Sequence, residues 1–109
     1  MKSNFLEDLL QALKENNEGP VDVERVVVTD LLDDYGRNEP RNEGIEAGRP
    51  YSWDEIFPRF DYPYDAGYGS ADCHFIHMWT ADRVYYIHEY DGSTYVESLP
   101  RNPPKKEMK

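Results

Sequence analysis

This chain contains one cysteine, few basic residues and no long apolar run. One cysteine cannot form an internal disulfide, which is typical of proteins from reducing compartments. No apolar run approaches the ~18–20 residues that a membrane-spanning helix needs, and we find no signal-peptide pattern. We therefore expect a cytoplasmic protein that makes no membrane contact.

The sequence also lacks the motifs of common reaction centres. It has no C-x-x-C pair, no H-x-x-x-H pair and no glycine-rich loop that follows a strand and could cradle phosphate. No candidate nucleophile is placed beside a general base. We expect no catalytic residues, no cofactor and no enzyme activity.

The charge of the chain is strongly one-sided. It has 12 Lys and Arg against 22 Asp and Glu, for a net charge of −10, although the last ten residues, PRNPPKKEMK, are basic. Contacts to phosphate need Lys and Arg, so the acidic body disfavours direct nucleic-acid binding and attracts basic protein surfaces. The simpler alternative is that the acidity only keeps a small protein soluble.

The length suits one domain, which we expect over residues 1–100, followed by a disordered basic tail over residues 101–109. An N-terminal helix is predicted from apolar side chains that recur at helical spacing. These side chains are Phe5, Leu6, Leu9, Leu10 and Leu13. Asn4 suits the N-cap of this helix, and Ser52 with Glu55 forms a capping box that predicts a short second helix.

Valine-rich residues 22–30 predict a strand, because β-branched side chains favour extended backbone. Its run Val26–Val28 lacks alternation, so we expect both faces of this strand to be covered. Residues 33–50 predict a long loop, either an ordered connector or a binding surface. Tyr62, Tyr64 and Tyr68 follow among Pro and Gly, and predict either a recognition loop or a lid packed over the sheet.

The C-terminal third predicts a three-stranded antiparallel meander near residues 73–79, 84–90 and 94–99. Asp91-Gly92 is a strong hairpin signal, because both central residues of a type I′ turn need positive φ. Strand alternation then sorts the side chains onto two faces. One face holds Cys73, Phe75, His77, Trp79, Val84, Tyr86, His88, Tyr90, Tyr95, Glu97 and Leu99. The other holds His74, Ile76, Met78, Tyr85, Ile87, Glu89, Thr94, Val96 and Ser98.

Neither face of this meander has the polar composition of a solvated surface. One amphipathic helix covers only one face, so the other face must meet the second helix with the tyrosine-rich segment, a second subunit or a partner protein. We expect an α+β fold with an antiparallel sheet of about four strands. The meander and the Val-rich strand form this sheet, the N-terminal helix packs on one of its faces, and a short second helix lies nearby.

Two histidines and a carboxylate on one face suggest a metal site as an alternative. His77, His88 and Glu97 would form a two-histidine, one-carboxylate set of the kind that binds iron or zinc. The simpler interpretation is that both imidazoles are packed among the aromatic residues of the sheet. Cys73 lies roughly 13 Å from His77 along an extended strand and cannot share an ion with it.

In size and charge the chain resembles a loose class of small, acidic, cytosolic α+β proteins that inhibit basic nucleases or nucleic-acid-binding proteins, including toxin-immunity, phage anti-defence and DNA-mimic proteins. This resemblance implies a non-enzymatic inhibitor that occupies a basic surface of a protein partner. No motif carries it, so it transfers no functional residue. The charged candidates are Asp30, Asp33, Asp34, Glu39, Glu43 and Glu46, and the candidate anchors are Tyr62, Tyr64 and Tyr68. A homodimer through the aromatic sheet face is the third alternative.

Overall fold

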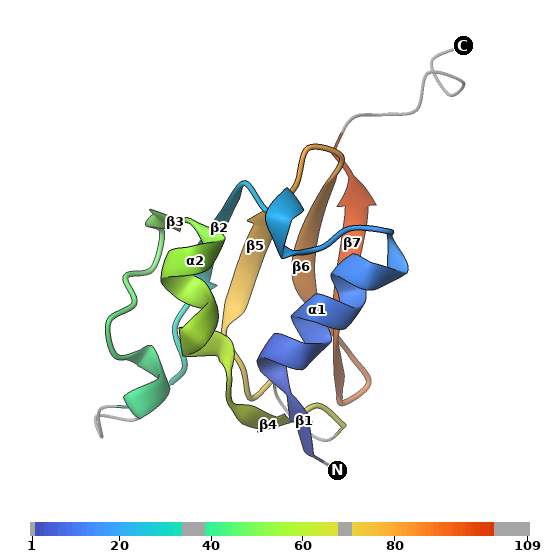
Figure 1. Ribbon diagram of the computed structural model, residues 1–109. Coiled ribbons are helices and arrows are strands. Elements are labelled where there is room, and N and C mark those ends of the chain that lie inside the picture. The colour runs from blue at the N-terminus through green and yellow to red at the C-terminus, as the bar shows by residue number, and fades with distance from the viewer. Residues whose placement is uncertain (1, 34–38, 68–70, 102–109) are drawn as a thin grey trace.

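The computed structural model describes residues 2–33, 39–67 and 71–101, which form an α+β fold (Figure 1). A five-stranded antiparallel sheet in the order β3-β2-β5-β6-β7 is its main element. The strands are β2 (Arg25–Asp30), β3 (Pro50–Tyr51), β5 (Phe75–Trp79), β6 (Arg83–Tyr90) and β7 (Ser93–Pro100). A separate pair joins β1 (Lys2–Asn4) to β4 (Pro63–Asp65).

The α+β class is confirmed, but the expected count of about four strands is too low. The meander and the Val-rich strand are both present. The Val-rich strand, β2, pairs with β5, the first strand of the meander. The short strand β3 then pairs with the other side of β2, and β1 and β4 form their own ladder. Strands of two or three residues carry too little alternation to be seen in the sequence.

The register of the meander agrees with the predicted faces. His77 pairs with Tyr86, and Tyr86 pairs in turn with Glu97. The hairpin between β6 and β7 turns at Asp91 (φ 51°) and Gly92 (φ 81°), as a type I′ turn requires. The side chains of β5, β6 and β7 are therefore sorted onto the faces that the alternation predicts.

The N-terminal helix α1 spans Phe5–Glu15 and begins where its cap predicts. The side chain of Asn4 accepts a hydrogen bond from the Glu7 backbone N–H. Phe5, Leu9 and Leu13 are fully buried against the sheet. Burial of this stripe, rather than helix propensity alone, holds an 11-residue helix in place.

The second helix α2 (Trp53–Ile56) continues into a 3₁₀ turn, η3 (Phe57–Phe60). Ser52 and Glu55 form the predicted capping box. Two further 3₁₀ turns, η1 (Pro20–Asp22) and η2 (Pro40–Asn42), lie in the connecting segments.

Both helices lie on the same face of the five-stranded sheet (Figure 1). We call this the inner face. Val26 and Val28 of β2 point into this side and are fully buried, whereas Val27 between them is half-buried on the opposite side. The expectation that both faces of the Val-rich strand are covered is therefore wrong, because the helices provide only one covering layer.

Leu9→Ala tests the helix–sheet core. The side chain of Leu9 is fully buried, so its removal should leave a cavity and lower the free energy of unfolding by about 2–5 kcal/mol. Denaturant unfolding measures the change. Gln11→Ala, on the exposed side of the same helix, should change the stability by about 0.5 kcal/mol or less. Equal effects of the two substitutions would contradict the described packing of α1.

Candidate functional site

The side of the sheet opposite the helices is an aromatic surface, which we call the outer face. Its residues alternate with buried ones along β2, β5, β6 and β7. They are Arg25, Val27, Phe75, His77, Trp79, Val84, Tyr86, His88, Tyr90, Tyr95, Glu97 and Leu99. A register shift after Val28 also places Asp30 opposite Phe75. The structure thus brings rings from three adjacent strands onto one surface.

No helix or strand within the described ranges covers the outer face (Figure 1). Tyr90, Tyr95 and Leu99 are 69 %, 39 % and 54 % exposed, whereas their neighbours on the inner face, Tyr85 and Ile87, are buried. Phe75, Trp79, Tyr86 and His88 are half-buried, and His77 is exposed. Among the described residues, the second helix and the tyrosine-rich segment therefore do not cover this face, which corrects the first of the three expected covers, whereas a second subunit or a partner protein stays a prediction.

The outer face is apolar and aromatic in its middle, with little charge. The His77 ring packs edge-on against Trp79 with centroids 5.7 Å apart, and the rings of His88 and Tyr95 lie 5.2 Å apart. Arg25, Asp30 and Glu97 are the only charged side chains that the register assigns to it among the described residues. A surface of this composition, rich in Trp and Tyr and poor in charge at its centre, is typical of protein–protein contacts.

The alternative metal site is not assembled. Tyr86 lies between His77 and Glu97 in one row across three strands, which separates those side chains by two strand spacings, about 9.5 Å. His88 packs on Tyr95 instead. Over residues 2–33, 39–67 and 71–101, no three His, Cys, Asp or Glu side chains are grouped so that they could hold a metal ion.

The predicted acidic residues lie at the end of β2 and in the segment that follows it, and one of them serves the fold. Asp30 ends β2 beside the outer face, and Asp33, Glu43 and Glu46 are exposed in the following segment. Glu46 also lies 3.8 Å from the exposed guanidinium of Arg49. Asp34 and Tyr68 lie outside the described residues. The remaining carboxylate, Glu39, takes part in an internal network.

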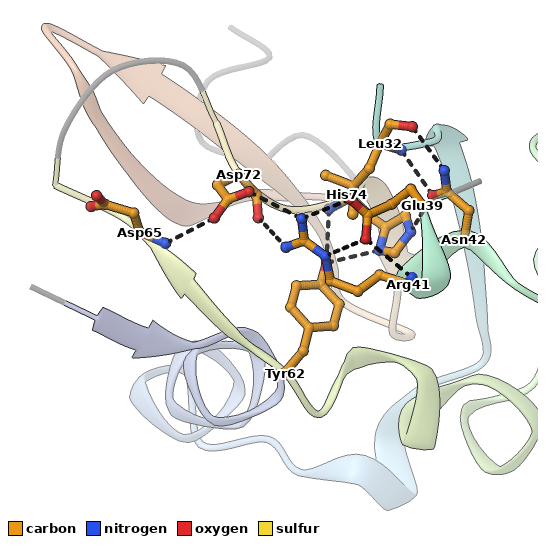
Figure 2. A network of polar contacts seen from close by, with 8 residues as sticks. All are labelled: Leu32, Glu39, Arg41, Asn42, Tyr62, Asp65, Asp72 and His74. Atoms are coloured by element: carbon orange, nitrogen blue, oxygen red, sulfur yellow. Dashed lines mark hydrogen bonds and ion pairs between the residues drawn. The ribbon is translucent and has the colours of Figure 1, made fainter. Parts of the chain in front are cut away.

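This internal network, which we call the His74 network, joins the segment after β2 to the start of β5 (Figure 2). The buried His74 ring has Nε2 2.9 Å from Oδ1 of Asn42 and Nδ1 2.8 Å from the Tyr62 hydroxyl. Asn42 Oδ1 also accepts from the Leu32 N–H, while its amide donates to the Leu32 carbonyl. Because Asn42 Oδ1 can only accept, Nε2 of His74 must carry the proton and Nδ1 must accept from Tyr62.

Arg41 ties the same network to the segment before β5 (Figure 2). Its guanidinium donates to both carboxylate oxygens of Glu39 and to the carbonyl and carboxylate of Asp72. It also lies 5.0 Å from the centre of the Tyr62 ring. The hydrogen bond from Arg41 lowers the pKa of Glu39. Glu39 therefore serves the fold and is a poor candidate for a partner's lysine or arginine.

Tyr62 and Tyr64 are core residues, which corrects their prediction as exposed anchors. Tyr62 is 7 % exposed and Tyr64 is 1 % exposed. Both rings pack on Phe5, at centroid distances of 5.5 and 5.7 Å, and the Tyr64 hydroxyl donates to Asp8. Burial raises the pKa of both phenols. Their contacts with Phe5 and Asp8 join them to α1 and to the core.

Cys73 precedes β5 and is buried at 2 % exposure, so it does not belong to the outer face on which strand alternation placed it. Burial, followed by the nearby charge of Asp72, raises the pKa of its thiol to about 12. A thiol that stays protonated is a poor nucleophile.

The outer face is the site that the residue list from the sequence missed. Strand alternation had already grouped Trp79, Tyr86 and Tyr95, so the signal was present. The information that was missing was which face the helices cover. The sequence alone left the loop tyrosines open between a recognition loop and a lid, and it did not show which strand tyrosines stay uncovered.

The His74 network predicts a specific loss of stability in mild acid. Burial, and then the charge of Arg41, lowers the pKa of His74 from 6.5 to about 4. Between these values the unfolded chain binds a proton that the folded protein does not, so the free energy of unfolding falls as the pH falls, by up to about 1.4 kcal/mol per pH unit. Denaturant unfolding of the wild type and of His74→Gln at pH 5 to 6.5 measures this, with a smaller slope expected for the variant.

A direct measurement covers the case in which His74→Gln does not fold. Nitrogen-15 shifts of the wild-type imidazole should show a neutral ring protonated at Nε2 at about pH 5.5. A positively charged His74 ring in the folded protein at that pH would contradict the network.

Comparisons of this chain with protein-family models, with curated proteins and with solved structures found no match. No helix among the described residues is long and apolar enough to cross a membrane. The assignment of the outer face as the candidate site accordingly rests on its geometry and composition.

Proposed function

We propose that this protein is a small acidic binding protein that docks on a basic surface of another protein through its outer face. The observation that carries the proposal is the uncovered aromatic surface of β5, β6 and β7 in a chain of net charge −10. A folded monomer gains nothing from leaving such a surface in water, and large exposed apolar patches mark interaction sites.

The outer face has the layout of a contact surface with a dry centre and a charged border. Tyr86 lies in the middle of β6 and Trp79 ends β5, and both strands have a neighbour on either side. Asp82 and Asp91 are exposed in the turns at opposite ends of β6, and Asp30 and Glu97 lie beside the rings. Central aromatic side chains supply most of the binding free energy, while charges at the border increase the association rate and select the partner.

The charge of the chain indicates which partners fit. A net charge of −10 repels nucleic acid and attracts proteins whose surfaces bind it. A nuclease or another nucleic-acid-binding protein presents clustered Lys and Arg for phosphate contacts. Occupation of such a surface would inhibit the partner by competition, without any covalent step.

Trp79→Ala and Tyr86→Ala test the proposal in pull-downs against purified basic nucleic-acid-binding proteins. Each substitution should weaken the binding of a true partner by at least about tenfold, because each removes a central ring. Phe57→Ala is the matched control, since Phe57 is a 37 % exposed ring in η3, away from the outer face. Binding should also weaken steeply between about 50 and 200 mM salt. A partner that binds the two outer-face variants and the wild type equally would contradict the proposed surface.

A homodimer through the outer face is the second candidate function. The aromatic composition of the face favours it, because two copies could stack their sheets there and remove the exposed rings from water. Light scattering separates the two candidates. A dimeric mass that persists at high salt supports the homodimer, whereas a monomer at all salt concentrations leaves the outer face free for a different protein.

A further inference from the structure

A second feature of the sheet suggests how the partner is held. Strand β7 is the last strand of the five-stranded sheet, beside α1 (Figure 1). An edge strand presents backbone N–H and C=O groups that can pair with another chain.

The hairpin fixes which residues of β7 direct their backbone N–H and C=O groups away from β6. Tyr90 and Ser93 flank the two-residue turn and form the first pair of the ladder. In such a hairpin this pair exchanges both hydrogen bonds, and every second residue after Ser93 also bonds β6. The residues between them, Thr94, Val96, Ser98 and Pro100, therefore direct their backbone groups away from β6.

Two observations agree with this assignment and show where the stretch of β7 that could pair with another chain begins and ends. The Thr94 N–H donates to the Ala66 carbonyl at 2.7 Å, which occupies one end of the edge. Pro100, which has no N–H, ends the strand. Between these ends lie the N–H and C=O groups of Val96 and Ser98, which have no backbone partner among the described residues. We call this stretch the β7 edge.

A groove of about 250 Å³ lies next to the β7 edge, between α1 and the Ala66 segment. Asp8, Gln11 and Glu15 of α1 line it, opposite Thr94 and Val96 of β7. Small-molecule pockets are usually larger, from about 300 Å³, so the size suits a single side chain. Two carboxylates and a side-chain amide in its wall favour a cation.

We propose that the β7 edge accepts an extended basic segment of the partner as a sixth strand, with a Lys or Arg side chain entering the groove beside Asp8 and Glu15. This inference rests on the proposed function and adds the form of the recognised segment. Backbone hydrogen bonds to Val96 and Ser98 would supply register and affinity, and the groove would supply selectivity.

The pleat of the sheet dictates the sequence pattern of that segment. A residue opposite Val96 points to the inner side, where the groove lies, and its neighbours in sequence point to the outer side beside Tyr95 and Glu97. The favoured partner segment therefore alternates basic residues with apolar or aromatic ones. Its apolar side chains would extend the contact made by the outer face.

Synthetic peptides test this with the full chain. The probe is a capped peptide in which arginine and valine alternate over about seven residues, and its control has the same composition with all arginines in one block. The alternating peptide should bind at least about tenfold more tightly, and should slow amide exchange at Val96 and Ser98. Equal binding of the two peptides without slowed exchange would mean charge attraction alone, and would overturn the proposal.

Two variants separate the edge from the groove. Glu15→Gln keeps the shape of the groove wall and should weaken the alternating peptide several-fold. Val96→Pro removes an N–H that points away from β6 and breaks no bond to β6, as Pro100 already does four residues further along the strand. It should abolish pairing. If Val96→Pro does not fold, the amide exchange of the wild type still decides the outcome.

The same variants separate this inference from the proposed function. A basic partner that loses affinity with Trp79→Ala but binds Val96→Pro and Glu15→Gln normally would leave the outer-face proposal intact and overturn the strand addition. Peptide pairing at Val96 in the absence of any protein that binds the outer face would support the strand addition and contradict the outer-face proposal.

Discussion

The structure depends on one constraint, which is that a single layer of helices has to cover a sheet that is apolar on both sides. Burial of α1 and α2 against the inner face gives the chain its core, with Phe5, Leu9 and Leu13 fully buried. The same burial leaves nothing within the described residues for the other face. Hydrophobic burial that stabilises the fold on one side thus creates an interaction surface on the other.

The buried tyrosines show how polar groups on the covered side of the sheet are hydrogen-bonded. Tyr62, Tyr64 and Tyr85 bury their rings, and each hydroxyl has a hydrogen-bond partner: His74, Asp8 and Glu18, respectively. Buried hydroxyl groups need such partners, because an unsatisfied polar group costs about 1–3 kcal/mol. Asp8 and Glu18 therefore help to satisfy buried hydroxyl groups, so part of the acidity of the chain serves the core.

The His74 network has a similar structural role. Residues 39–42 have little apolar surface of their own, and Arg41 and Asn42 hold them to the start of β5 by hydrogen bonds and an ion pair. The burial of Ile45 and the hydrogen bond from the Gly48 N–H to the Val28 carbonyl hold the later part of this segment to the sheet. The network holds residues 39–42 against His74 and Tyr62.

Much of the fold could be predicted from the sequence because its signals are local. The stripe from Phe5 to Leu13 determines α1, Ser52 and Glu55 begin α2, and Asp91-Gly92 sets the register of β6 and β7. The covered face could not be predicted, since both faces are apolar and the choice depends on where α1 and α2 dock. The burial of Tyr62 and Tyr64 could not be predicted for the same reason, because it depends on their contact with Phe5 of α1.

Hydroxyl-radical footprinting of the dilute protein tests the central claim most directly, because it reports side-chain exposure residue by residue. The account predicts strong labelling of Tyr90, Tyr95 and Leu99 on the outer face and protection of Tyr62, Tyr64 and Tyr85 inside, with the outer-face labelling lost when a partner binds. Protection of Tyr95 and Leu99 in the isolated monomer would show that the chain covers its own sheet, and would contradict the account.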